Sequence, residues 1–159
     1  QISVSNQEAA EFLKSYFKKF SEIKDYMNST INFCRKNGYV NNIFGRRCHI
    51  PSINDKNYNV RNFQERAAIN APIQGSAADI MRLAMIRLNN KLSSLADLKT
   101  KMLLQIHDEL VFETPKDELL KIAPIIKEEM SKVTSSELHS FSISLTVDIN
   151  SGENWGLVY

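Results

Sequence analysis

The sequence contains few cysteines and no long apolar run. Cys34 and Cys48 are the two cysteines among 159 residues, and their spacing fits neither a CxxC pair nor a metal site. This pattern excludes a disulfide framework, and we expect a reducing, cytoplasmic environment. No apolar stretch reaches the length of a membrane-spanning helix, and the first residues lack the pattern of a signal peptide, so we expect no membrane partner. Internal repeats and low-complexity tracts are absent from the sequence as well.

Charge is distributed unevenly along the chain, although the net charge is only +2. Residues 1–101 carry 16 basic and 8 acidic side chains, a net charge of +8, whereas residues 102–159 carry 4 basic and 10 acidic side chains, a net charge of −6. A basic segment is typical of a surface that grips a phosphate backbone, and an acidic one of a metal site for phosphoryl chemistry. The acids between 117 and 129 also fit the exposed face of a helix.

The spacing of apolar residues predicts an α+β fold, with helices and an antiparallel sheet. The hydrophobic content of 43% is enough for a core of ordinary size. The expected helices cover residues 7–20, 22–36, 61–71, 76–95 and a segment that Thr114 and Pro115 open, with Asp117 at its capping-box position. The expected strands form hairpins at 39–50, just after Gly38, and at 102–113, and a final strand alternates apolar residues from 143 to 149.

Pro72 divides the expected helices at 61–71 and 76–95. A proline lacks the N–H group, and its ring clashes with the carbonyl four residues back, so we expect a kink or break between Asn70 and Gly75. Ser76 then fits an N-cap, with Asp79 at the capping-box position. The polar connector at 52–59 is the expected internal boundary.

Two carboxylates and a histidine interrupt the apolar run at 102–113. Strand character on both sides places His107, Asp108 and Glu109 at the tip of a tight antiparallel turn. Half-burying a carboxylate costs several kcal/mol without a partner, and the run contains no Lys or Arg. Mg²⁺ would be a suitable partner, because it takes one or two protein carboxylates and completes its shell with water and phosphate. A solvated turn between core strands explains the same pattern.

Three hydrogen-bond donors follow one another at steps of four. Arg66, Asn70 and Gln74 would lie along one stripe of a helix. Every base pair presents acceptors in the DNA minor groove, so such a stripe would report pair geometry without preferring a sequence. The alternative is that Asn70 and Gln74 mark a break in the helix and that Arg66 is a solvated charge.

Several of these segments resemble the family A DNA polymerases. QIHDELVFE at 105–113 looks like the family's C-terminal catalytic motif, and ERAAINAPIQGSAAD at 65–79 is similar to its ERxAxNxPxQGxAAD pattern. GYVNNIFGRRCHIP at 38–51 resembles the GYVxTxxGRRRxLP stretch, with Cys48 where arginine is common and with residues 41–43 departing from the pattern. Residues 151–155 match the closing segment. The resemblance covers essentially the whole chain.

The resemblance implies a role for each candidate residue of the catalytic motif. Asp108 would be one of two carboxylates that hold a catalytic pair of Mg²⁺ ions, Glu109 a nearby and less critical acid, and His107 a neighbour of the primer terminus. The residues implied in DNA binding are His107, Arg66, Asn70, Gln74, Arg46 and Arg47. For Arg46 and Arg47, a solvated turn explains the sequence equally well. Trp155 is expected to be a packing anchor.

The implied reaction is DNA-directed nucleotidyl transfer from a dNTP to a primer 3′ hydroxyl, in DNA replication and repair. Residues 1–58 would form the distal part of the fingers subdomain, and residues 59–159 the palm with its catalytic hairpin at 102–113. The motif with the second metal-binding aspartate and the segment that grips the triphosphate are not found in this sequence. We therefore expect a C-terminal fragment that is inert alone and whose partners are primer-template DNA, dNTP and the N-terminal remainder of the polymerase.

Three other classes of protein share parts of this pattern. A metal-dependent phosphohydrolase would need more ligands than one Asp-Glu pair, and the sequence has no HxD or DxD cluster. A non-catalytic, sequence-specific DNA-binding module would need a recognition helix and a larger basic excess. A family A RNA polymerase relative shares the catalytic logic, and the sequence leaves the choice between deoxynucleotides and ribonucleotides open.

Overall fold

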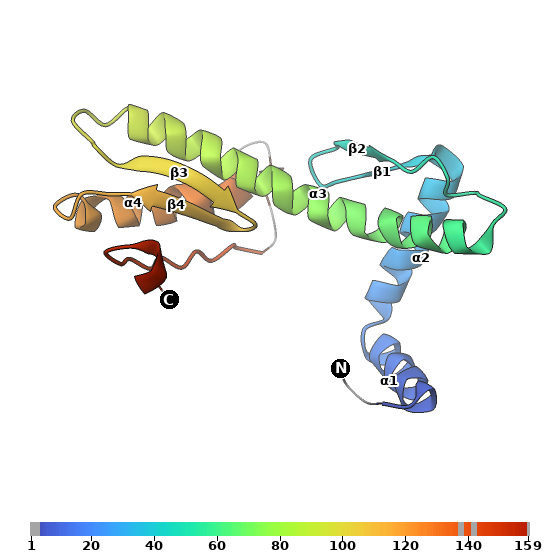
Figure 1. The fold of residues 1–159 in the computed structure, drawn as a ribbon. Coiled ribbons are helices and arrows are strands. Elements are labelled where there is room, and N and C mark those ends of the chain that lie inside the picture. Colours follow the sequence, from blue (N-terminus) through green and yellow to red (C-terminus); the bar gives the residue numbers. More distant parts are fainter. Residues whose placement is uncertain (1–3, 137–138, 141–142, 159) are drawn as a thin grey trace. The chain divides into compact units, whose positions relative to one another are not determined.

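The computed structural model describes residues 4–136, 139–140 and 143–158, and Figure 1 shows their fold. Helices combine with small antiparallel sheets, which confirms the predicted α+β class. The chain divides into two compact units, Gln1–Gly75 and Ser76–Tyr159. Within the described residues, no helix has both the length and the apolar character needed to cross a membrane.

The first unit begins with two helices whose ends follow local sequence signals. Helix α1 (Asn6–Lys19) starts at a capping box, in which the Ser5 hydroxyl accepts from the Glu8 N–H and the Glu8 carboxylate accepts from the Ser5 N–H. Helix α2 (Ser21–Asn37) ends at Gly38, whose φ of 78° lies in the left-handed region that glycine adopts without strain. The helices predicted at 7–20 and 22–36 are thus confirmed.

A short hairpin follows, with strand β1 (Tyr39–Asn41) antiparallel to strand β2 (Arg47–His49), as predicted for residues 39–50. The core of the first unit joins this hairpin to α2 and to the next helix. Its buried members are Cys34, Val40, Ile50, Ile53 and Ala68. Both cysteines are free, Cys34 within this core and Cys48 on the surface.

Helix α3 (Tyr58–Ser93) runs for 36 residues with Pro72 inside it, so of the predicted kink or break the break is wrong, and so is the predicted N-cap at Ser76. Packing on both sides of Pro72 explains the difference. Ala68 is buried in the first unit, and Ser76, Ala84 and Leu88 are buried farther along the helix. Burial of the three apolar side chains favours the helix and opposes the ~3 kcal/mol that a proline costs inside it.

The boundary between the two compact units also differs from the expected one. It lies at Gly75 and Ser76, within α3, and not in the connector at 52–59. Residues 52–57 of the connector contain turns and bends, and its last two residues already belong to α3. The assignment of residues 1–58 to fingers and 59–159 to palm stays a prediction.

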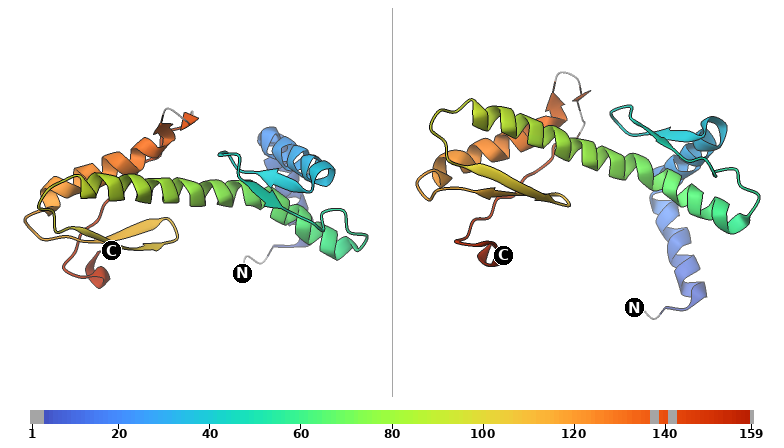
Figure 2. Two further views of the ribbon diagram at one scale, coloured as in Figure 1. Left: turned by 90° about the horizontal axis from the view of Figure 1, so that it is seen from above. Right: turned by 45° about the horizontal axis from the view of Figure 1, so that its top comes forward.

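In the second unit, strand β3 (Lys101–Ile106) pairs antiparallel with strand β4 (Glu109–Glu113), which confirms the predicted hairpin. Helix α4 (Leu119–Ser131) begins later than the predicted start at Thr114-Pro115. Leu88 of α3 packs with Ile122 and Ile126 of α4, and Leu110 and Phe112 of β4 pack against them. Figure 2 shows α4 beside the C-terminal part of α3.

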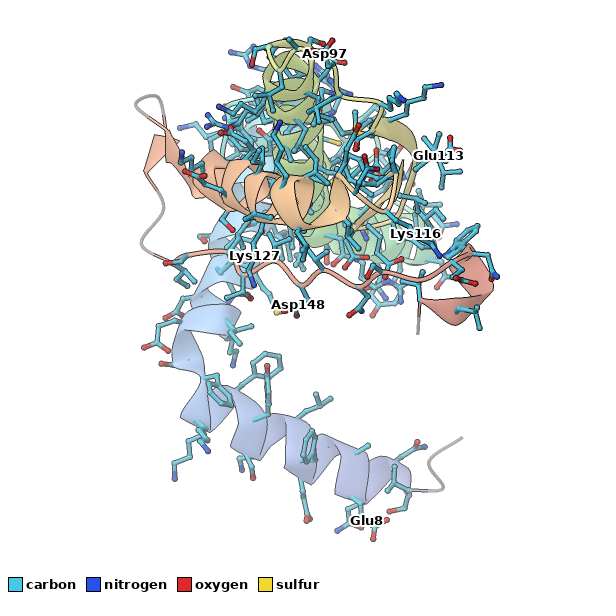
Figure 3. The ribbon with its side chains drawn as sticks, turned by 90° about the vertical axis from the view of Figure 1, so that its left-hand side faces the viewer. Glu8, Asp97, Glu113, Lys116, Lys127 and Asp148 are labelled. Carbon is cyan, nitrogen blue, oxygen red and sulfur yellow. The ribbon has the colours of Figure 1, made fainter. Side chains whose placement is uncertain are left out.

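The rest of the second unit contains only short elements. They are the 3₁₀ helix η1 (Lys132–Thr134), the strands β5 (Ser135–Ser136) and β6 (His139–Ser140), and the 3₁₀ helix η2 (Trp155–Leu157). The strand predicted at 143–149 is wrong, because the described residues there pair with no other strand. Trp155 is 50% exposed, so it is not the packing anchor that we expected. Instead, Lys116 binds Glu153 at 2.8 Å, and Figure 3 shows Lys116 beside the C-terminal segment.

Candidate functional site

The turn of the β3–β4 hairpin consists of His107 and Asp108. Ile106 pairs with Glu109, so the two strands are joined by the shortest common connection. His107 has a φ of 51°, in the left-handed region that side-chain-bearing residues adopt rarely and at some cost. The side-chain amide nitrogen of Gln105, Nε2, donates to the His107 carbonyl at 3.0 Å. Local hydrogen bonding and a tight turn therefore fix the tip, as the sequence predicts.

The side chains of His107, Asp108 and Glu109 are all exposed at this tip. Both carboxylates are therefore exposed to solvent, and not half-buried as the sequence led us to expect. Their oxygens are nevertheless the hard ligands that Mg²⁺ prefers. Within the described residues, no three His, Cys, Asp or Glu side chains gather into a metal-binding group. The Asp108–Glu109 pair thus fits a cation whose remaining ligands are water and phosphate oxygens. The described side chains do not surround such an ion by themselves.

Arg66, Asn70 and Gln74 are exposed on α3, and we call them the donor stripe. Because the helix continues through Pro72, steps of four residues keep the three side chains on one face. The predicted break would have turned Gln74 away from the other two. The structure therefore brings together the three donors that the sequence singled out.

Arg46 and Arg47, the two arginines of the β1–β2 hairpin, are exposed but differ in their contacts. Arg46 Nη2 donates to the Gly75 carbonyl of α3 at 3.2 Å. The Arg47 guanidinium lies over the Tyr39 ring, 4.7 Å from its centroid, in a cation–π contact. Both keep exposed surface that phosphate could reach.

Asn42 is a residue whose position the sequence reasoning missed. Its side chain is 8% exposed, and its Oδ1 accepts from the N–H groups of Phe44 at 3.0 Å and Arg46 at 2.9 Å. Its Nδ2 donates to the Gly75 carbonyl at 3.2 Å. The signal available in the sequence was an asparagine three residues before Gly45, since asparagine side chains close turns by bonding to the following backbone.

The candidate residues are divided between the two compact units. Arg46, Arg47 and the donor stripe belong to the first unit, and the hairpin tip with Asp108 belongs to the second. The first set offers hydrogen-bond donors and positive charge, which suit a nucleic acid. The second offers carboxylates, which suit a divalent cation.

Comparisons with known proteins agree with this chemistry. Residues 1–157 match the family described as DNA polymerase family A. DNA polymerase I of Streptococcus pneumoniae serotype 4 is 44% identical over 154 residues, which cover 97% of this chain and 17% of that protein. DNA polymerase I of Rhizobium leguminosarum is 46% identical over 157 residues, 98% of this chain and 15% of that protein. The chain therefore spans about one sixth of the length of these relatives.

A solved structure supports the same relationship. The POL domain of Pol1 from M. smegmatis, in a complex with DNA primer-template and dNTP, matches with a TM-score of 0.90 and 35% sequence identity. The match covers 99% of this chain and 27% of that chain. The similarity thus extends over both compact units.

Proposed function

Since the chain belongs to DNA polymerase family A, we propose that it is part of a longer DNA-directed DNA polymerase, in which it serves nucleotidyl transfer from a dNTP to a primer 3′ hydroxyl. The observation that carries the proposal is the exposed His107-Asp108-Glu109 tip in a chain that matches this family along its length. The partners would be primer-template DNA, dNTP and the remaining N-terminal part of the polymerase, and the process DNA replication and repair.

Asp108 would hold Mg²⁺, with Glu109 as the adjacent acid and two ions present in the complete enzyme. Support comes from the exposure of both carboxylates at the turn, where water and phosphate oxygens can complete the shell of a hard cation. When bound, the metal supplies positive charge that stabilises the attacking and leaving oxygens. His107, held in its turn by Gln105, would lie near the primer terminus.

The donor stripe would contact the minor groove of the primer-template duplex. Three exposed donors on one helical face can bond to the acceptors that every base pair presents there. Arg46 and Arg47 would contact backbone phosphates, and the net charge of +8 over residues 1–101 favours such binding. These contacts position DNA without reading its sequence.

We also propose that residues 1–58 belong to the fingers and residues 59–159 to the palm. The second part contains the catalytic hairpin and the helix that carries the donor stripe. The cytoplasmic location expected from the cysteine pattern stays a prediction.

Template-directed primer extension by the longer polymerase tests the proposed function. A labelled primer on a defined template is incubated with Mg²⁺ and either four dNTPs or four rNTPs. The proposal predicts extension that follows the template and uses dNTPs. Equal extension with rNTPs would favour the RNA polymerase alternative, and DNA binding without extension would favour the non-catalytic binding module.

A further inference from the structure

Pro72 lies between two helix carbonyls that accept hydrogen bonds from side chains outside α3. The Tyr26 hydroxyl of α2 donates to the carbonyl of Ile69, three residues before the proline, at 3.1 Å. Asn42 Nδ2 and Arg46 Nη2 both donate to the carbonyl of Gly75, three residues after the proline, each at 3.2 Å. A donor from α2 and two donors from the β1–β2 loop therefore bond to carbonyls of α3 on either side of Pro72.

A proline inside a helix removes one backbone hydrogen bond and crowds the preceding turn, so the helix tends to kink or break there. Side chains that bond to carbonyls on both sides of Pro72 oppose that tendency by fixing the path of the backbone. We infer that Tyr26, Asn42 and Arg46 form a brace that keeps α3 helical across Pro72. They are thereby positioning residues for the donor stripe, an inference that rests on the proposed function of that stripe.

Both the oxygen and the nitrogen of the Asn42 side-chain amide make hydrogen bonds. Its Oδ1 accepts from the N–H groups of Phe44 and Arg46, which closes the loop around Gly45. The Gly45 N–H in turn donates to the Asn42 carbonyl at 3.0 Å, and its φ of 80° suits glycine. The loop thus orients Nδ2 toward α3 and places the Arg46 side chain beside it.

Apolar packing supports the brace from the same elements. Ala67 and Ala71 of α3 pack against the buried cluster that contains Cys34 of α2 and Val40 of β1. A shallow groove of about 400 Å³ next to Pro72 is lined mainly by α2 and β1, including the Tyr26 ring. The alanine side of α3 therefore faces the first unit's core, while the donor stripe remains exposed.

The consequence for the donor stripe depends on position. Arg66 and Asn70 precede Pro72, whereas Gln74 follows it. Each helical residue turns the side chain by about 100°, so a change of path at Pro72 moves Gln74 relative to the other two. Loss of the brace should therefore act chiefly through Gln74.

Amide hydrogen exchange of the 159-residue chain tests the brace itself. Tyr26→Phe and Asn42→Ala each remove a donor, and each is combined with Pro72→Ala, which restores the missing N–H. With Pro72 present, exchange at residues 73–79 should accelerate by roughly 2- to 10-fold for Tyr26→Phe, which loses one hydrogen bond, and by at least as much for Asn42→Ala, which also loses the two bonds that close its loop. With Pro72→Ala, the same variants should change exchange much less. Equal acceleration in both backgrounds, or none in either, would overturn the brace.

Matched controls separate the brace from general destabilisation. Asn28→Ala removes an exposed amide from α2 that does not line the groove next to Pro72, and Tyr16→Phe removes a hydroxyl from α1. Neither should change exchange at residues 73–79. If these controls accelerate exchange there as much as Asn42→Ala and Tyr26→Phe, the effect is not specific to the brace and the inference is wrong.

A double-mutant cycle in the longer polymerase tests the positioning role. Extension from matched and mismatched primer ends is measured for Asn42→Ala, Gln74→Ala and the double variant. If Asn42 acts through Gln74, the double variant should extend about as slowly as Gln74→Ala alone. Fully additive losses would contradict positioning. A neutral Gln74→Ala would instead contradict the proposed role of the donor stripe, while the exchange experiment still decides the brace.

Discussion

The hydroxyl of Thr100 donates a 2.6 Å hydrogen bond to the carboxylate of Glu118, just before β3 begins. The backbone N–H groups of Lys99 and Thr100 donate to the same carboxylate at 2.9 and 3.0 Å. Donors that bond to the charged form favour it, and the Thr100 hydroxyl contributes most, so the pKa of Glu118 lies below its ordinary value of 4.5. One side chain thus holds the segment that leads into the β3–β4 hairpin.

The first prediction concerns acid stability. Because the folded-state pKa of Glu118 is lowered, its contribution to stability is complete above pH 4.5 and is lost as the pH falls through the folded-state pKa. In the Glu118→Gln variant, the free energy of unfolding should therefore fall less steeply as the pH is lowered below 4.5. Urea unfolding between pH 3 and 7 measures this, with the exposed Glu11→Gln as control. Parallel profiles for wild type and Glu118→Gln would refute the role of this carboxylate.

A second prediction concerns the core of the second unit. Ile122 is 1% exposed and packs with the fully buried Leu88, so Ile122→Ala leaves a cavity and should cost about 2–5 kcal/mol of unfolding free energy. Ile86→Ala is the control, because Ile86 is 50% exposed on α3, and its cost should stay below about 1 kcal/mol. Urea denaturation monitored by circular dichroism compares them. Equal losses for the two variants would show that Ile122 is not a core residue.

Signals within a few residues predicted much of this fold. The left-handed Gly38 ends α2, and two apolar runs on either side of His107-Asp108 form the β3–β4 hairpin. The helix end depends on the backbone preference of glycine, and the hairpin depends on the apolar residues on either side of its turn. Residues close in sequence determine both features. The position of the turn at His107-Asp108 and the spacing of the donor stripe were predictable for the same reason.

Features that depend on distant contacts were not predictable from the pattern. The proline rule predicted a break at Pro72, but packing of Ala68 and donors from Tyr26 and Asn42 keep α3 continuous. The alternation at 143–149 predicted a strand, but a strand needs a neighbour to pair with, and none lies beside the described residues there. Tertiary context decided the outcome in both cases.

A third prediction concerns the donor stripe. Gln74→Ala removes the hydrogen bond that we propose Gln74 makes to the minor groove, which should weaken the primer complex of the longer polymerase by about 0.5–1.5 kcal/mol. Since every base pair presents acceptors there, the loss should be similar for all four terminal base pairs. Asn89→Ala, also exposed on α3 but outside the donor stripe, is the control. A penalty confined to one base pair would indicate sequence readout.

The fourth prediction concerns the 159-residue chain alone, which should be inert in primer extension with Mg²⁺ and four dNTPs. The hairpin tip offers one pair of carboxylates, Asp108 and Glu109, and the chain covers 17% and 15% of the length of two DNA polymerase I relatives, so metal and nucleotide should bind without productive geometry. Weak duplex binding that falls steeply as salt is raised is still expected from the basic residues 1–101. Template-dependent product that disappears on Asp108→Ala would disprove this prediction.

The most direct measurement compares Asp108→Asn with wild type in the longer polymerase, by primer extension and by primer-template affinity. The substitution removes the charge of the proposed metal ligand and keeps its shape, so extension should fall by several orders of magnitude while DNA affinity changes little. Asp97→Asn is the matched control, since Asp97 is exposed and lies outside the hairpin. Near-normal extension by Asp108→Asn would contradict the assignment of Asp108 as the metal ligand.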